Sequence, residues 1–186
     1  RVLFCFASIN PATGEQLAMI ASCGADDVDL AVEKAREAFD DGRWSRLHPT
    51  ARKDVLIRFS KLLLRHRHEL AVLESLDSGK TIYDCATVDI PETIHCLKWH
   101  AEAIDKIYDQ VSPASDDHMA LLVREPFGVV GLSLPWNFPL LMLAWNSGPA
   151  LAAGCSVILK PAMQTTLTAL RVADLASPSA PPLEVA

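Results

Sequence analysis

The sequence predicts an α/β protein in which an amino-terminal helical layer is followed by a parallel βαβ unit. Three observations lead to this fold class. Apolar side chains recur every three or four residues in several segments between 26 and 108, as on amphipathic helices. Two short apolar runs at 127–134 and 156–159 lack polar alternation, which is typical of parallel strands covered on both faces. The segment 138–153 between these runs has helical character.

Size and composition exclude several classes of protein. The chain has 186 residues, of which 50% are hydrophobic, so it can bury a sizeable core. The net charge of −6 and the lack of a long basic block argue against nucleic acid as a partner. The five cysteines are scattered and form no C-x-x-C pair. We therefore expect reduced thiols, a cytoplasmic protein and no metal site.

A long uncharged stretch requires that a transmembrane helix be considered. No charged residue occurs from Pro126 to Leu159. Prolines and glycines divide this stretch into pieces of ordinary strand and helix length. We therefore expect no membrane span.

The amino-terminal elements begin with a hairpin. The segment 9–15 contains the proline and glycine of a turn, and the segment 16–21 then alternates as a strand does. A helical period follows from Asp26, and we expect Asp26 or Asp27 to cap this first helix.

Three more helices are predicted before the chain changes character. The second covers about 51–64, and the third covers about 70–76 and ends at Gly79, which suits a left-handed cap. The fourth begins near Pro91, because proline fits the first turn of a helix. After a polar, turn-rich segment at 110–117, residues 119–123 are predicted to form a strand.

The βαβ unit places a candidate ligand site beyond the carboxyl ends of its strands. Pro135-Trp136-Asn137 follows the first strand, and a loop opening with Lys160-Pro161 follows the second. Asn137 lies between two prolines that restrict the backbone, so its amide could donate to a developing oxyanion. The alternative is that Asn137 only caps the following helix, since asparagine is a favoured cap residue.

Several consecutive motifs resemble those of the aldehyde dehydrogenase superfamily. They are Glu-Pro-Phe-Gly-Val-Val-Gly at 125–131, Pro-Trp-Asn-Phe-Pro-Leu at 135–140, Trp-x-x-Gly-Pro-Ala-Leu-Ala-Ala-Gly at 145–154 and Val-Ile-Leu-Lys-Pro at 157–161. The resemblance extends back through Leu-Asp-Ser-Gly-Lys at 76–80 and covers nearly the whole chain. The segment 103–108 looks most like the branch that acts on amino-aldehydes such as γ-glutamyl-aminobutyraldehyde.

The resemblance implies a domain organisation. Residues 1–109 would form the amino-terminal helical part of a Rossmann-like coenzyme-binding domain, and residues 110–125 an arm of the kind that pairs subunits. Residues 126–176 would form the first βαβ unit of that domain, followed by a loose proline-rich tail at 177–186. The fold is incomplete relative to the family, because the catalytic domain is absent from this sequence.

The activity that the resemblance implies is the NAD(P)-dependent oxidation of an aldehyde to a carboxylic acid. In the family a cysteine forms a thiohemiacetal, hydride passes to the nicotinamide, and a glutamate activates the water that releases the acid. Asn137 matches the family's oxyanion donor, and Lys160 matches the lysine that binds the adenosine ribose. Leu134, Pro135 and Trp136 match the strand end that lines the coenzyme cleft.

Two further sets of residues follow from the resemblance. Phe138, Met142 and Trp145 match positions that line the substrate tunnel, although an apolar helix face can equally be plain core. Met163 stands where the family usually has a glutamate that binds the ribose hydroxyls. A thioether is only a weak acceptor, so both NAD and NADP remain candidate cofactors.

The sequence contains neither the family's nucleophilic cysteine nor its glutamate base. We therefore expect a truncated and inactive fragment. The alternative is a non-catalytic interaction module that associates with full-length relatives. A homo-oligomer is expected in either case from the resemblance of 119–124 to the subunit-pairing arm.

Overall fold

The computed structural model describes residues 4–177. Its first element is the predicted hairpin, in which β1 (Cys5–Ile9) and β2 (Gln16–Ala21) pair in antiparallel fashion. Gly14 adopts a φ of 75° in the connecting turn, a conformation that glycine tolerates at little cost. The amino-terminal hairpin is therefore confirmed.

The first helix begins slightly earlier than predicted. The helix α1 (Ala25–Asp40) has Gly24 as its N-cap, and the carboxylate of Asp27 accepts a hydrogen bond from the Gly24 N–H at 2.9 Å. The prediction that Asp26 or Asp27 occupies the cap position was wrong. Asp27 instead reaches back from the third helical position, where a carboxylate also satisfies the start of a helix.

Two long helices follow in the predicted places. They are α2 (Pro49–Arg65) and α3 (Arg67–Ser78). Gly79 ends α3 with a φ of 76°, so the predicted left-handed cap is confirmed.

The fourth helical region starts well before Pro91. A short α4 (Ile82–Asp84), a π-helical turn η1 (Cys85–Asp89) and α5 (Ile90–Ala103) follow one another, and a 3₁₀ turn η2 (Ile104–Lys106) ends the series. Thr81 caps the start, because its hydroxyl oxygen accepts from the Asp84 N–H at 3.1 Å. The predicted helix near Pro91 is confirmed as α5, with Pro91 in its first turn, whereas α4 and η1 before it were not predicted.

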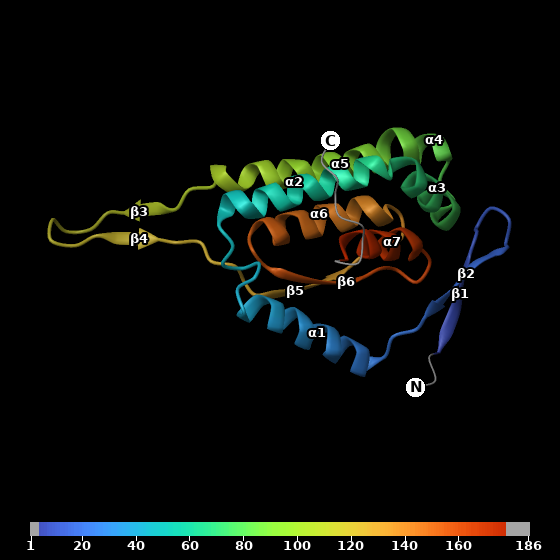
Figure 1. Cartoon of the computed structure of the whole chain (residues 1–186), viewed down its shortest axis with the longest axis horizontal. Coiled ribbons are helices and arrows are strands. Elements are labelled where there is room, and N and C mark those ends of the chain that lie inside the picture. Colours follow the sequence, from blue (N-terminus) through green and yellow to red (C-terminus); the bar gives the residue numbers. More distant parts are fainter. Residues whose placement is uncertain (1–3, 178–186) are drawn as a thin grey trace.

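A two-stranded arm projects from the helical body (Figure 1). The strands β3 (Gln110–Ser112) and β4 (Ala120–Leu122) pair in antiparallel fashion. The strand predicted at 119–123 is confirmed, whereas β3 lies in a segment that was predicted to be a turn-rich loop.

The predicted βαβ unit is present. The strands β5 (Val129–Ser133) and β6 (Ser156–Lys160) are parallel, and α6 (Pro139–Ala152) connects them. A last helix, α7 (Leu167–Ala176), follows β6 and was not predicted. In Figure 1, α1 lies on one side of this two-stranded sheet and α6 on the other, so each face has helical cover.

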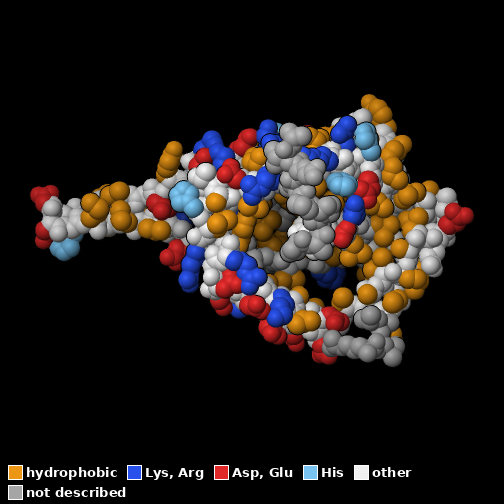
Figure 2. Space-filling view, viewed as in Figure 1, with side chains coloured by type: hydrophobic (Ala, Val, Ile, Leu, Met, Phe, Trp, Pro, Cys, Tyr) orange, Lys and Arg blue, Asp and Glu red, His pale blue; other side chains and the backbone are white. Residues whose placement is uncertain are grey.

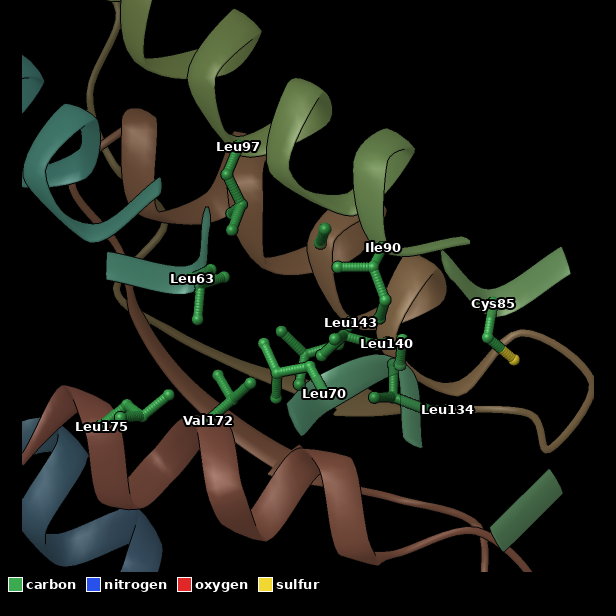
Figure 3. Close-up of a cluster of buried hydrophobic side chains, with 12 residues drawn as sticks. Leu63, Leu70, Cys85, Ile90, Leu97, Leu134, Leu140, Leu143, Val172 and Leu175 are labelled. Carbon is green, nitrogen blue, oxygen red and sulfur yellow. The ribbon is translucent and has the colours of Figure 1, made fainter. Parts of the chain in front are cut away.

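The main core lies where α2, α3, α5, α6 and α7 meet (Figure 3). Leu63, Leu70, Leu97, Leu140 and Leu143 are almost completely buried there. Burial of one such side chain contributes about 1.5–3 kcal/mol, so these contacts supply much of the force that holds the βαβ unit against the helical layer.

The described helices include none that is both long and apolar enough to cross a membrane. The uncharged stretch is divided among β5, α6 and β6 instead. The proline-rich tail at 178–186 lies outside the described residues.

Candidate functional site

The two candidate loops begin side by side at one edge of the parallel sheet. Ser133 and Lys160 are partners in the register of β5 and β6. One residue further on, the Leu134 N–H donates to the carbonyl oxygen of Lys160 at 3.0 Å. The loop with Asn137 and the loop that opens with Lys160 therefore leave the sheet together, as expected for parallel strands.

Asn137 does not cap the helix that follows it. The cap residue of α6 is Phe138, and it supplies no side-chain hydrogen bond to the helix. The Asn137 side chain is exposed and makes no hydrogen bond to any residue between 4 and 177. The interpretation of Asn137 as a helix cap was therefore wrong, and its amide N–H groups are available to a ligand.

The start of α6 is capped by Glu74, which lies on α3 and is completely buried. One of its carboxylate oxygens accepts from the Leu140 N–H at 3.0 Å. The other oxygen accepts from the Thr168 hydroxyl of α7 at 2.7 Å. Burial raises the pKa of the Glu74 carboxyl group to about 7.

Asp77 makes a parallel connection one turn further along α3. One oxygen of its buried carboxylate accepts from the Leu167 N–H, at the start of α7, at 2.8 Å. The other accepts from the Ser8 hydroxyl of β1 at 2.7 Å. Sequence reasoning missed both acids. The available signal was two carboxylates three residues apart on the helix face that also carries the buried Leu70.

The carboxyl end of α6 is also held by distant residues. The indole N–H of Trp44 donates to the Leu151 carbonyl at 3.2 Å, and the Arg52 guanidinium donates to the Ala152 carbonyl at 3.0 Å. A carboxylate at the start and a cation at the end complement the helix dipole. The helix that follows Asn137 is therefore fixed at both ends.

Lys80 connects the helical layer to Phe138. Its ammonium group lies 3.8 Å from the centre of the Phe138 ring and also forms an ion pair with Asp89. Asp89 is only 1% exposed, and neither of its side-chain oxygens accepts an aligned hydrogen bond from a described residue. The Lys80 ion pair is thus the main compensation for this buried charge.

The candidate substrate residues differ in exposure. Phe138 is 37% and Trp145 56% exposed, whereas Met142 is half-buried. The interpretation of these three residues as plain core is therefore wrong for Phe138 and Trp145. They form an accessible apolar strip at the start and middle of α6.

The candidate coenzyme residues lie around the same edge. Leu134 is buried, while Pro135 and Trp136 are exposed. Lys160 is exposed at the end of β6, and no ion pair links its ammonium group to a described residue. Met163 is 59% exposed in the loop after Lys160. The edge thus offers one cation and no carboxylate from these two loops.

None of the chain's cysteines belongs to either loop. Burial raises the pKa of Cys85 to about 11 and also raises that of Cys96, so both thiols are held in the unreactive protonated form. Cys155 is buried before β6, and Cys5 and Cys23 lie by the amino-terminal hairpin. The two candidate loops therefore contain no thiol.

Comparisons with known proteins agree with this geometry. A sequence model described as the aldehyde dehydrogenase family matches residues 4–186. The aminoacetaldehyde dehydrogenase of Pseudomonas aeruginosa is 62% identical over 97% of this chain and 36% of its own length. The NADP/NAD-dependent aldehyde dehydrogenase PuuC of Escherichia coli is 47% identical over 92% of this chain and 34% of its own length.

Solved structures give the same result. The γ-glutamyl-γ-aminobutyraldehyde dehydrogenase of Burkholderia cenocepacia matches with a TM-score of 0.91 at 52% identity, over 92% of this chain and 35% of that one. The P. syringae indole-3-acetaldehyde dehydrogenase in complex with NAD⁺ and IAA matches with the same values. The chain spans about a third of the length of these relatives. It belongs to the aldehyde dehydrogenase family.

Proposed function

We propose that the chain is the amino-terminal part of an NAD(P)-dependent aldehyde dehydrogenase. In this proposal it supplies the oxyanion donor and one side of the coenzyme cleft. The observation that carries the proposal is that the two loops begin side by side at one edge of the sheet. Ser133 and Lys160 are register partners there, and Asn137 lies in the loop after Ser133. The side chains of Asn137 and Lys160 are both exposed there.

Asn137 would act on the substrate carbonyl. Its amide N–H₂ donates to the aldehyde oxygen as negative charge develops on that atom during nucleophilic attack. Removal of one such donor typically lowers kcat about 10²- to 10³-fold. The buried contacts of α6 fix the helix that follows Asn137, so the backbone next to Asn137 is positioned before the reaction.

The residues at this edge fit a nicotinamide dinucleotide. The Lys160 ammonium can donate to ribose hydroxyl or phosphate oxygens, and the Leu134 N–H donates to the Lys160 carbonyl, so the loop that begins at Leu134 leaves the sheet beside Lys160. Met163 adds no negative charge that would repel a 2′-phosphate. The proposal therefore includes both NAD and NADP. When bound, the nicotinamide would accept the hydride from the substrate.

The substrate class is proposed from the apolar strip and the relatives. Phe138, Met142 and Trp145 offer an accessible surface to the carbon chain of an aldehyde. The names of two relatives refer to aminoacetaldehyde and to γ-glutamyl-γ-aminobutyraldehyde. We therefore propose an aliphatic amino-aldehyde. The free cysteines are compatible with a cytoplasmic setting.

Coenzyme binding by the full 186-residue chain tests the proposal. Titration with NAD⁺ or NADP⁺ should quench the tryptophan fluorescence of the chain in a saturable manner, because the exposed Trp136 lies at this edge. Lys160→Ala should weaken binding at least about fivefold, as loss of a hydrogen bond to a charged group would. Lys98→Ala is the matched control, because Lys98 is an exposed lysine on α5. Absence of saturable binding, or equal affinities of the two variants, would contradict the coenzyme site.

Turnover requires a cysteine nucleophile, and none of the five cysteines lies in the two candidate loops. We therefore propose that the chain alone does not reduce NAD⁺ in the presence of aldehyde. Activity should appear when it assembles with a polypeptide corresponding to the remaining two thirds of a relative. Asn137→Ala in that assembly should lower kcat strongly and should leave the Kd for the coenzyme nearly unchanged. Dehydrogenase activity of the chain alone would contradict this part.

The interaction module is the second candidate. The observation that favours it is the projecting arm, on which Val111, Leu121 and Leu122 are each more than half exposed. Figure 2 shows hydrophobic side chains gathered along the projecting arm. Stable association with a full-length relative, without any coenzyme binding by the chain, would favour this role over the first.

A further inference from the structure

The helices that follow the two site loops share one feature. Phe138 and Thr166 occupy the cap positions of α6 and α7, and neither contributes a side-chain cap hydrogen bond. The N–H groups at a helix start need partners when they are buried. In both helices these partners come from α3, which is remote in sequence.

We propose that Glu74 is a positioning residue that fixes the starts of α6 and α7 relative to each other, and with them the loops that carry Asn137 and Lys160. The proposal rests on the proposed function, because it assigns these loops to one ligand site. Glu74 itself touches neither loop residue and has no place in the chemistry.

The Glu74 carboxylate holds two helices at once, and we call it, with its two hydrogen bonds, the Glu74 clamp. The two oxygens of one carboxylate are a fixed distance apart, and each has a partner on a different helix, Leu140 on α6 and Thr168 on α7. Glu74 lies in the interior of α3 and is completely buried, so its side chain has little freedom to follow a helix that moves. Displacement of either helix start therefore breaks one of two buried hydrogen bonds.

Asp77 extends the clamp but does not replace it. Its contact with the Leu167 N–H holds α7 alone, and its other oxygen contacts Ser8 in the hairpin. Only Glu74 among the acids of α3 contacts both helices. Leu140 is three residues beyond Asn137, so we expect the oxyanion loop to depend on Glu74 more strongly than the Lys160 loop does.

Amide hydrogen exchange of the full chain tests this inference without any ligand. Glu74→Ala should speed exchange at least about tenfold in peptides covering both 138–143 and 166–170, while the interior of α2 keeps its protection. Thr168→Val removes the hydrogen bond between Glu74 and α7, so it should speed exchange at the start of α7 only. Glu74→Gln keeps a carbonyl oxygen for Leu140 and an amide donor for the Thr168 oxygen, so it should restore protection at both sites.

Glu69→Gln is the matched control. The exposed Glu69 also connects α3 to α7, but through the half-buried Arg171 at 2.7 Å and away from the helix start. This variant should leave both peptides unchanged. The inference is overturned if Thr168→Val opens both helix starts, if Glu74→Gln opens them as Glu74→Ala does, or if Glu69→Gln has the same effect.

Coenzyme titration of the same variants separates this inference from the proposed function. If Glu74 positions the site, Glu74→Ala should weaken NAD⁺ binding about three- to tenfold, and Glu74→Gln should restore it. If the unmodified chain does not bind NAD⁺, the proposed function fails, and the exchange pattern still decides whether the clamp exists. Unchanged NAD⁺ affinity in Glu74→Ala would overturn the link between the clamp and the site.

Discussion

The ammonium group of Lys80 lies between the buried carboxylate of Asp89 and the face of the Phe138 ring, 3.8 Å from the ring centre. The first contact neutralises a charge that would otherwise be buried without a partner. The second holds the ring of a residue next to Asn137. One side chain thus links the π-helical turn η1 to the candidate site.

Removal of the Lys80 charge should be costly. In Lys80→Met the buried Asp89 carboxylate loses its ion pair, and the loss of one partner of a buried pair typically lowers the free energy of unfolding by about 3–5 kcal/mol. Urea unfolding followed by circular dichroism measures this change. Lys98→Met should change the free energy by less than about 1 kcal/mol, because Lys98 pairs with Glu102 in solvent.

The double variant Lys80→Met, Asp89→Asn shows whether the buried charge causes the loss in the free energy of unfolding. An amide in place of the carboxylate removes the buried charge, so the double variant should be more stable than Lys80→Met alone. Equal stability of the two variants would show that the cost comes from lost packing or from the Phe138 contact instead.

The burial of Glu74 predicts a pH dependence of stability. Its pKa is raised from 4.5 to about 7, chiefly by burial, against the opposing hydrogen bonds from Leu140 and Thr168. Between these two pH values the folded chain keeps a proton that the unfolded chain has released. The free energy of unfolding should therefore fall as the pH rises from about 4.5 through 7, by roughly 3 kcal/mol from this group.

Glu74→Gln isolates this contribution from other titrating groups. Glutamine stays neutral, so the difference between the variant and the original chain should be small at pH 5 and should favour the variant at pH 8. Urea unfolding at several pH values gives both curves. Parallel curves across this range would contradict the raised pKa.

Alanine substitutions at two glycines with nearly equal φ distinguish the cost of backbone strain from the cost of a steric clash. Gly14 and Gly79 have φ values of 75° and 76°. A Cβ at Gly14 meets no atom within 4 Å, whereas one at Gly79 would lie 2.6 Å from Pro11 Cγ. Gly14→Ala should cost about 1–2 kcal/mol from strain alone, and Gly79→Ala should cost more. Similar losses in thermal unfolding would show that Pro11 moves aside.

Local signals in the sequence were sufficient for much of the fold. The end of α3 followed from Gly79, and the parallel strands followed from uninterrupted apolar runs beside a helical segment. The strand β3 was missed because its segment is mostly polar. It is a strand because it pairs with β4 across the connection 113–119, and not because of local propensity. The start at Ile82 was missed because Thr81 was not recognised as a cap.

In the candidate site, too, local features could be predicted and contacts between distant residues could not. The adjacency of the loops that contain Asn137 and Lys160 could be predicted, because parallel strands end at one edge of the sheet. The role of Glu74 could not be predicted, since its partners Leu140 and Thr168 are 66 and 94 residues away. The cap assignment for Asn137 failed for the same reason, because the cap of α6 comes from a different part of the chain.

The projecting arm predicts self-association of the chain. Leu121 and Val111 are cross-strand partners and are 60% and 71% exposed, so they present an apolar surface that a second copy could cover. Leu121→Asp places a charge on this surface and should weaken association about tenfold or more, since burial of an unpaired charge is costly.

Sedimentation velocity over a range of concentrations measures this effect. Gln110→Glu is the matched control, because it adds the same charge to the arm at a position that alternates to the other face. It should leave the association constant nearly unchanged. If the original chain is monomeric at every concentration, or if both variants dissociate equally, the Leu121 face of the arm does not mediate self-association, and a different partner or surface must cover it.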